Sequence, residues 1–333
     1  MRGKDVIGMR KGFERIKENA VLRYVCRRLL SLIPVLIGVT LLTYALMYLS
    51  PKDPVEMMLQ AQGTAPSPVV VDAMRHQLGL DRPFIVQYLD WLCRFVRGDM
   101  GVSYIDGGSV AAKLLTALPN TLKLAVSSVA VTILLSVPLG ILTAVFQGKA
   151  VDLILRFLSF IGNSLPNFVV SLLLLYFFAL KLGWFPILST GSAISLVLPT
   201  LALAVPMTGK YIRQIRAAVL EQIGKPYVDG AVSRGIRTRI VLFHDVLRNA
   251  MITIVTLMSM SIGALLGGTA AIEMIFVLPG LGYMVTSAVT ARDYPVIQGF
   301  VVWMCLIYIF INLLTDISYY YLDPRVSAGM GVE

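Results

Sequence analysis

Two carboxylates stand in otherwise apolar stretches of this sequence, Glu273 and Asp316. A charge in the middle of a membrane-spanning helix costs roughly 2.5–3.5 kcal/mol on insertion scales, so such residues are rare and often functional. Both residues also stand near the end of their stretch, where a side chain can reach water or a hydrogen-bond partner. Two interpretations stay open: a snorkelling or hydrogen-bonded end residue, or a polar contact that lines a path or a subunit interface.

A second group of polar residues surrounds a proline. Asn163, Ser164 and Asn167 flank Pro166 in the middle of an apolar run, which combines hydrogen-bonding groups with a helix-bending residue. Ser259 lies in a later apolar run that is rich in small residues. Close helix packing explains the small residues of that run as well as a path does. We take Asn163, Ser164, Asn167, Ser259, Glu273 and Asp316 as candidates for lining a translocation path.

Motifs for catalysis are missing. Four Gly-Lys pairs occur, but the Ser or Thr of a phosphate-binding Walker A loop follows none of them: the next residues are Asp5, Ala150, Tyr211 and Pro226. Neither HExxH nor GxSxG is present. The only histidines, His76 and His244, are too few for a His-rich metal cluster. We therefore expect no catalytic residue, no cofactor-binding residue and no metal site, and not an enzyme.

Composition points to a membrane protein. Of 333 residues 57% are hydrophobic and 14% charged, whereas soluble domains carry about 25% charged residues. Cys26, Cys93 and Cys305 are far apart and odd in number, which argues against a disulfide framework.

Six stretches are long enough to cross a membrane, for which about 20 helical residues are needed. They are residues 29–49, 124–146, 153–180, 194–211, 250–278 and 296–320. Prolines occur within the third and fourth, where neighbouring helices can satisfy the freed backbone groups. The predicted fold class is all-α, with six transmembrane helices.

The charges indicate the orientation. Of the 29 Lys and Arg residues, 20 fall on the side of the two termini: nine in residues 1–28, two in 147–156, eight in 209–250 and one in the tail. By the positive-inside rule this side is cytoplasmic. The net charge of +10 therefore flanks membrane spans and does not form the basic stripe of a nucleic-acid-binding domain. We expect a multi-pass protein of the cell (inner) membrane with both termini cytoplasmic.

The predicted segments are residues 1–28 (cytoplasmic and basic), 29–49 (first span), 50–120 (extracytoplasmic), 121–320 (five-helix core) and 321–333 (cytoplasmic tail). Within 50–120, Ser67, Pro68 and Gly79 mark the start and end of one helix. A second should run from Pro83 to about Arg97 with one apolar face. This segment is either a cap on the bundle or a surface that docks something delivered from outside.

The loop 213–248 is too polar for a span and too long for a turn. A short helix should end at Gly235, since glycine commonly stops helices, and a second should start at about Thr238. Tyr227, Val228, Ala231 and Val232 alternate with charged residues. A solvated basic loop needs no such stripe, so we favour a face that a cytoplasmic partner covers.

Several of these stretches resemble the inner-membrane permeases of ABC importers for dipeptides, oligopeptides and nickel. The resemblance covers about residues 21–326. It rests on residues 50–54 (SPKDP), 78–83 (LGLDRP), 87–88 (QY), 98–103 (GDMGVS), 118–121 (LPNT), 247–250 (LRNA), 279–282 (PGLG), 292–298 (RDYPVIQ) and 322–325 (LDPR), in this order. It implies the type I importer permease fold, with a MetI-like core and an extracytoplasmic helical segment between the first two spans.

The family's cytoplasmic signature is Glu-Ala-Ala-x-x-x-Gly, and residues 229–235 (DGAVSRG) stand in its place. Ala231 and Gly235 match, Asp229 keeps the charge, and Gly230 departs from the pattern. The resemblance implies that this loop forms a coupling helix in a groove of an ATPase subunit. The expected ATPase-coupling residues are Tyr227, Asp229, Gly230, Ala231, Arg234 and Gly235.

The resemblance also implies partners and a substrate class. A second homologous permease, two ATP-binding subunits and an extracytoplasmic substrate-binding protein complete such a transporter, and ATP binds the partners. The short loop between the third and fourth spans, residues 181–193, slightly favours nickel, free or chelated, over peptides.

Two other function classes stay open. A secondary transporter driven by protons or sodium predicts carboxylates at mid-membrane and uptake without an ATPase. An intramembrane enzyme or scaffold predicts a nucleophile or metal constellation, and none is found in the sequence.

Overall fold

The computed structural model describes residue 30 and residues 33–49, 53–61, 63 and 67–322; a few side chains within its helices lie outside this description. The chain forms two compact units. One comprises residues up to Arg97 together with those from Gln298, and the other is Gly98–Ile297. Each unit is described separately below. The basic segment 1–28 and most of the tail 321–333 lie outside the described residues.

In the first unit, the apolar helix Ile33–Tyr48 is followed by three short helices. They are α2 (Pro54–Ala61), α3 (Pro68–Gln77) and α4 (Phe84–Val96). The expected helix signals are confirmed: Ser67 is the N-cap of α3, Pro68 opens it, and Gly79 follows with φ of 68°. Ser67 nevertheless makes no side-chain capping hydrogen bond, so it contributes to the start of the helix only through its extended backbone.

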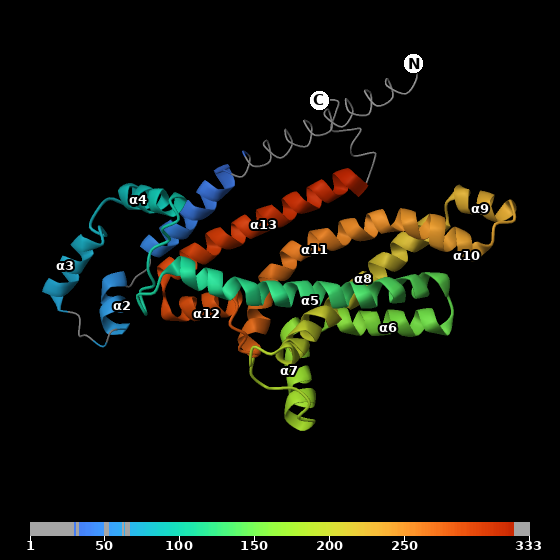
Figure 1. Ribbon diagram of the computed structural model, residues 1–333, viewed down its shortest axis with the longest axis horizontal. Helices are drawn as coiled ribbons and strands as arrows, with labels where there is room; N and C mark the ends of the chain where they lie inside the picture. Colours follow the sequence, from blue (N-terminus) through green and yellow to red (C-terminus); the bar gives the residue numbers. More distant parts are fainter. Residues whose placement is uncertain (1–29, 31–32, 50–52, 62, 64–66, 323–333) are drawn as a thin grey trace, which may run out of the picture. The chain divides into compact units, whose positions relative to one another are not determined.

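The second unit is a set of long helices (Figure 1). Its elements in order are α5 (Val110–Val145), α6 (Ala150–Ser164), α7 (Asn167–Leu174), the π-helical turn η1 (Leu175–Lys181), the 3₁₀ turn η2 (Ala193–Leu196), α8 (Val197–Ile223), α9 (Pro226–Ser233), α10 (Thr238–Ile240), the π-helical turn η3 (Val241–Val246), α11 (Leu247–Ile275), α12 (Leu281–Ala291) and the start of α13 (Tyr294–Leu322). The pair α5 and α8 forms its centre, with α6 and α11 packed on α8.

Close packing of α8 depends on two glycines. A Cβ atom at Gly140 of α5 would lie 2.7 Å from the Ile215 side chain of α8. A Cβ at Gly209 of α8 would lie 2.5 Å from the Ser159 carbonyl oxygen of α6. Both distances are shorter than van der Waals contact, so these positions let three helices approach closely.

Three described helices are long and apolar enough to cross a membrane: Val110–Val145, Ala193–Ile223 and the part Tyr294–Leu314 of α13. The pair α6 and α7–η1 would make a fourth, but its halves are bent by 100°. The expected bend at Pro166 is confirmed, whereas the count of six spans stays a prediction. Helix α11 takes the place of the fifth expected span.

Two boundaries differ from expectation. Helix α5 begins at Val110, so the boundary placed after residue 120 falls inside a helix, and Pro119 does not interrupt it. Helix α8 likewise continues through Pro206 to Ile223, so the first third of the expected loop 213–248 is helical. Hydropathy predicts where an apolar stretch ends. The helices are longer than their apolar stretches because their ends carry polar residues.

Candidate functional site

Helix α9 lies in the connection between α8 and α11. Pro226 occupies its first turn, where a missing N–H costs nothing, and Lys225 before it is extended. Gly235 ends it in the left-handed region, with φ of 82°. The Ile236 N–H bonds the Ala231 carbonyl at 3.2 Å, which is the hydrogen bond of a Schellman stop. The expected short helix, and the second helix from Thr238, are confirmed.

One face of α9 packs inside the chain. Val228 and Ala231 are buried in an apolar cluster with Tyr211 and Ile215 of α8 and with Val246 of η3. The apolar stripe seen in the sequence is therefore only partly available to a partner. The buried half of the stripe packs α9 against α8 and η3.

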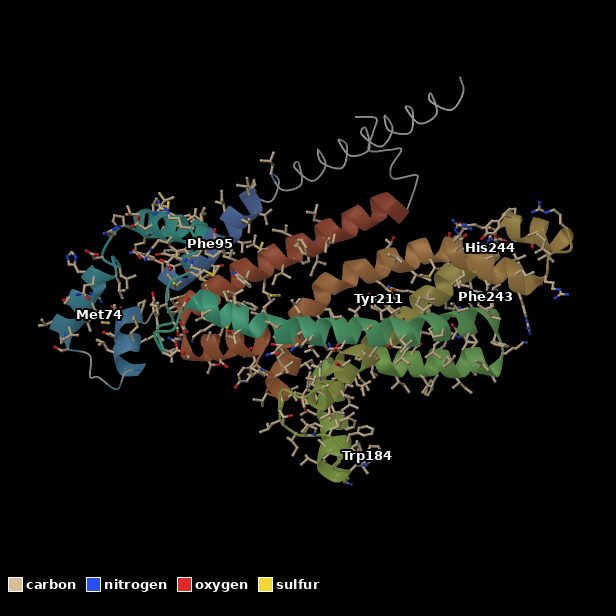
Figure 2. The ribbon with its side chains drawn as sticks, in the orientation of Figure 1. Met74, Phe95, Trp184, Tyr211, Phe243 and His244 are labelled. Atoms are coloured by element: carbon tan, nitrogen blue, oxygen red, sulfur yellow. The ribbon has the colours of Figure 1, made fainter. Side chains whose placement is uncertain are left out.

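The other face of α9 is open. Asp229, Gly230 and Arg234 are exposed, and Val232 is 43% exposed although it is apolar. The next residues add exposed apolar side chains: Ile236, Ile240 and Phe243. Phe243 lies beside His244 at the end of the unit that holds α9 and α10 (Figure 2). We call Asp229, Gly230, Val232, Arg234, Ile236 and Phe243 the α9 surface.

Tyr227 ties this surface to the rest of the unit, whereas Arg234 bonds within α9. The Tyr227 hydroxyl donates to Gln222 Oε1 at 3.3 Å and accepts from Asn249 Nδ2 at 3.5 Å. The Arg234 Nε donates to the Gly230 carbonyl at 3.1 Å. Tyr227 therefore links α9 to both α8 and α11, so a movement of α9 would be passed to two long helices.

A buried ion pair joins α6 to α8. Asp152 has no exposed surface, and its two carboxylate oxygens accept from Arg216 at 3.0 and 3.1 Å. Arg156 contacts the same carboxylate at 3.0 Å, and the Gly148 N–H donates to it at 3.0 Å. A bidentate guanidinium pair has a fixed geometry. This pair could not be predicted from local sequence patterns, because Asp152 and Arg216 are 64 positions apart.

The polar residues around Pro166 lie at the bend between α6 and α7. Asn163 and Ser164 are exposed at the end of α6, and Asn167 opens α7. The tight approach of Gly209 brings α8 against this bend. Asn167 lies beside Gly268 of α11, since its Nδ2 would be 3.9 Å from a Cβ at that position. Helices from three parts of the unit thus meet where three of the six candidate path residues lie.

Two other path candidates lie outside the description. The side chains of Ser259 in α11 and Asp316 in α13 are not among the described residues.

Glu273 is fully buried at the end of α11. Its carboxylate accepts a hydrogen bond from the Thr121 hydroxyl at 2.7 Å and from the Tyr283 N–H at 3.0 Å. This is the geometry of the hydrogen-bonded end residue, one of the two interpretations left open. A role in lining a path stays a prediction for Glu273.

Helix α12 and its surroundings were missed in the sequence. Asp293, just after α12, is 3% exposed and accepts from the Ser103 hydroxyl and, at 3.0 Å, from the Tyr104 N–H. A cavity of about 580 Å³ lies beside it. Its lining comes from the loop before α5, the first turns of α5 and the inner side of α12, and is mostly apolar. Lys113, at its edge, is paired with Asp106 at 2.7 Å.

Hydrogen bonds from Lys113 and then from the Gly108 N–H lower the pKa of Asp106 to about 2. Among the described residues, no group of three His, Cys, Asp or Glu side chains is arranged to hold a metal ion. The candidate features of the second unit are therefore an exposed face of α9, a polar bend between α6 and α7, and a mostly apolar cavity beside α12.

Comparison with known proteins gives matches over nearly the whole chain. The family described as "Binding-protein-dependent transport system inner membrane component" matches residues 136–328, and its N-terminal family matches residues 21–125. Oligopeptide transport system permease protein AppB of Bacillus subtilis (strain 168) is 35% identical over 318 residues, covering 91% of this chain and 98% of AppB. Metal-staphylopine import system permease protein CntB of Staphylococcus aureus (strain NCTC 8325 / PS 47) is 32% identical over 308 residues, covering 92% and 99%.

A solved structure supports the fold. A structure of inward-facing conformations of the MetNI methionine ABC transporter matches with a TM-score of 0.53 and 18% identity. The match covers 63% of this chain and 96% of that one. At this identity the likeness concerns the fold alone.

Proposed function

Since this chain belongs to the family of binding-protein-dependent transport system inner membrane components, we propose that it forms half of the translocation path of an ATP-driven importer. The chain is a permease subunit, and ATP hydrolysis takes place on partner subunits. The observation that carries this proposal is the α9 surface, a rigidly held helix with an exposed apolar and charged face.

The proposed coupling works through packing. Val228 and Ala231 pack α9 against α8 and η3. Asp229, Val232 and Arg234 are exposed and can contact a partner. An ATPase subunit that pulls on the free face would move α8 and α11 together, because Tyr227 bonds residues of both. Such a rigid-body movement can switch a cavity between two sides of a membrane.

We place the α9 end on the cytoplasmic side. Residues 209–250 hold eight Lys and Arg, which agrees with the positive-inside rule. The proposed location is the inner membrane. The proposed topology has six spans, with both termini in the cytoplasm. The α12 end, with its cavity, would then face the outside.

The proposed partners are a second homologous permease, two ATP-binding subunits and an extracytoplasmic substrate-binding protein. The polar bend at Asn163, Ser164 and Asn167 is the proposed path, with Ser259, Glu273 and Asp316 as further candidates. A cofactor is not needed by this chain, because the path only has to bind, orient and release its substrate.

Peptides are the favoured substrate class. AppB is named for oligopeptides and CntB for a metal-staphylopine complex. A path lined by amides and hydroxyls suits the polar groups that peptides and organic metal chelates share. Nickel as a chelate is therefore kept as the second candidate.

Uptake in the native cells tests this proposal. Cells that lack this chain should lose uptake of a labelled oligopeptide, and the full chain should restore it. Restoration should fail when the Walker A lysine of the partner ATPase is replaced. Uptake that persists without a functional ATPase and stops with an ionophore would support an ion-coupled transporter instead.

A parallel arm with labelled nickel, alone and with a chelator, separates the substrate classes. Loss of nickel-chelate uptake with unchanged oligopeptide uptake would favour the second candidate.

A further inference from the structure

The apolar face of helix α4 is wide, and only part of it is packed. Tyr88 and Gln87 are buried, and Trp91 and Phe95 continue the same side of the helix. Beside them, Ile85, Leu89 and Val96 are 57%, 50% and 78% exposed. The apolar face predicted for this helix is therefore only partly packed, because Leu89 and Val96 belong to it but lie exposed next to the part that holds Tyr88.

The exposed residues form a continuous arc. At about 100° per residue, the exposed Ile85, Val86, Leu89, Cys93 and Val96 cover about 100° of the helix circumference, and the half-buried Leu92 joins this arc to the packed side. The charged residues of α4 and its C-cap fill a narrower strip between this arc and the buried face: Asp90, Arg94 and Arg97. A helix in water normally presents the reverse, with polar residues over all of its exposed surface.

The buried face attaches α4 to an apolar helix. The Tyr88 hydroxyl and the Thr40 hydroxyl are 2.9 Å apart, and Tyr44 donates to Gln87 Oε1 at 3.3 Å. Aromatic rings of Tyr44, Tyr48 and Phe84 meet edge to face beside these bonds. The exposed side of that helix is apolar too, with Ile33, Leu42 and Leu46 at least half exposed.

The position of Thr40 sets a depth. It lies nine residues before Leu49, the last residue of the expected first span, which corresponds to about 13 Å along a helix at 1.5 Å per residue. The hydrocarbon core is about 30 Å thick. A side chain that reaches Thr40 must therefore come from a helix that itself lies within the outer part of the bilayer.

We propose that α4 is an amphipathic helix embedded in the outer leaflet of the membrane, with its Ile85–Val96 arc in contact with lipid acyl chains. Four observations support lipid as the occupant. The arc is wide and apolar, and it adjoins a strip with two arginines. Tyrosine and tryptophan lie together on the packed side of α4, and Thr40, to which Tyr88 bonds, lies at bilayer depth. Interfacial helices combine these features. The extracytoplasmic segment would then rest on the membrane, held at a fixed height beside the first span.

This inference rests on the placement of the helix Ile33–Tyr48 in a membrane, but not on the ATPase coupling or the substrate.

The native Cys93 lies on the proposed lipid face and provides the test. With Cys26 and Cys305 replaced by serine, the full chain carries one thiol, because the sequence has three cysteines. Bimane is attached to Cys93 in detergent, and its fluorescence emission is measured after the protein is reconstituted into phosphatidylcholine vesicles. The matched control moves the thiol about 100° around the helix to the charged strip: Arg94→Cys in a chain that also carries Cys93→Ser. If Cys305→Ser impairs folding, Cys305→Ala takes its place.

Nitroxide-bearing lipids should quench the probe at position 93, and its emission should be shifted to the blue relative to position 94. Aqueous iodide should quench mainly the probe at position 94. Equal iodide quenching at both positions would overturn the proposal, and so would resistance of position 93 to both quenchers, which would indicate a protein partner on this face. Because the probe reports on α4 alone, a failed ATPase interaction leaves this reading unaffected.

Discussion

The Thr121 hydroxyl donates a hydrogen bond of 2.7 Å to Glu273 Oε1, although the two residues are 152 positions apart. Thr121 also accepts from the Leu281 N–H at 2.8 Å, and Glu273 accepts from the Tyr283 N–H. Gly280, the N-cap of α12, has no side chain to satisfy these first N–H groups. The pair Thr121–Glu273 thus caps α12 from two other helices.

Removing the Thr121 hydroxyl should destabilise this end of the protein. Thr121→Val keeps the shape but leaves buried hydrogen-bonding groups of Glu273 and Leu281 without that partner, at a cost of about 1–3 kcal/mol per group. Thr121→Ser keeps the hydroxyl and serves as the control. Unfolding in detergent by denaturant should rank wild type and Thr121→Ser together, with Thr121→Val below them. Equal stability of all three would contradict the capping role.

The Asp152–Arg216 pair should be essential for stability as a pair. Arg216→Met leaves a fully buried carboxylate with Arg156 as its remaining cation, and breaking a buried pair costs about 3 kcal/mol or more. The control is Arg213→Met, since Arg213 is exposed on the same helix. Adding Asp152→Asn to Arg216→Met should recover part of the loss, which denaturant unfolding would measure. A double variant no better than Arg216→Met would show that the charge is not the cause.

Two glycine-to-alanine changes should have opposite effects. At Gly230 a Cβ meets nothing within 4 Å, so Gly230→Ala should stabilise α9 by about 0.5–1 kcal/mol through helix propensity. At Gly209 the same change places a Cβ 2.5 Å from the Ser159 carbonyl, and α6 and α8 must separate. Thermal unfolding of the two variants should fall on opposite sides of wild type. A destabilised Gly230→Ala would mean that position 230 needs glycine for another reason.

The pairing of Asp106 with Lys113 should depend on pH only in acid. The pKa of Asp106 is lowered to about 2 from an ordinary value of 3.8, so its contribution is complete above about pH 4 and disappears as the pH falls towards 2. Amide-exchange protection of residues 103–108 should be constant from pH 8 to 5 and decrease below pH 4. Asp106→Asn should reduce protection at neutral pH and remove the acid-dependent change. A change between pH 8 and 5 that needs Asp106 would contradict this assignment.

Much of the local structure could be predicted from the sequence, because it depends on neighbouring residues. Pro68 and Gly79 bracket α3, Gly235 ends α9, and Pro166 marks the bend between α6 and α7. These signals act through backbone geometry within one turn of a helix.

The contacts between distant segments could not be predicted in this way. Ser103 and Asp293 belong to two stretches that carried the family resemblance, and only the fold brings their side chains together. Asn120 and Pro279 are a second such case, joined by a hydrogen bond of 2.9 Å. Hydropathy also did not predict α12, because an apolar helix of 11 residues is too short to be identified as a membrane span.

The proposed docking of an ATPase subunit on the α9 surface is central to the proposed function, and one substitution tests it directly. Val232→Asp places a charge on an exposed apolar residue of α9 without touching the buried Val228 and Ala231. Its control is Leu78→Asp, at a residue of nearly equal exposure, 40% against 43%, in the predicted extracytoplasmic segment.

The measurement is the amount of Walker A ATPase that co-purifies with the tagged full chain from native membranes in mild detergent. The account predicts that wild type and Leu78→Asp retain the ATPase and that Val232→Asp loses it while being inserted in the membrane at the same level. Undiminished ATPase with Val232→Asp, together with undiminished substrate uptake, would contradict it.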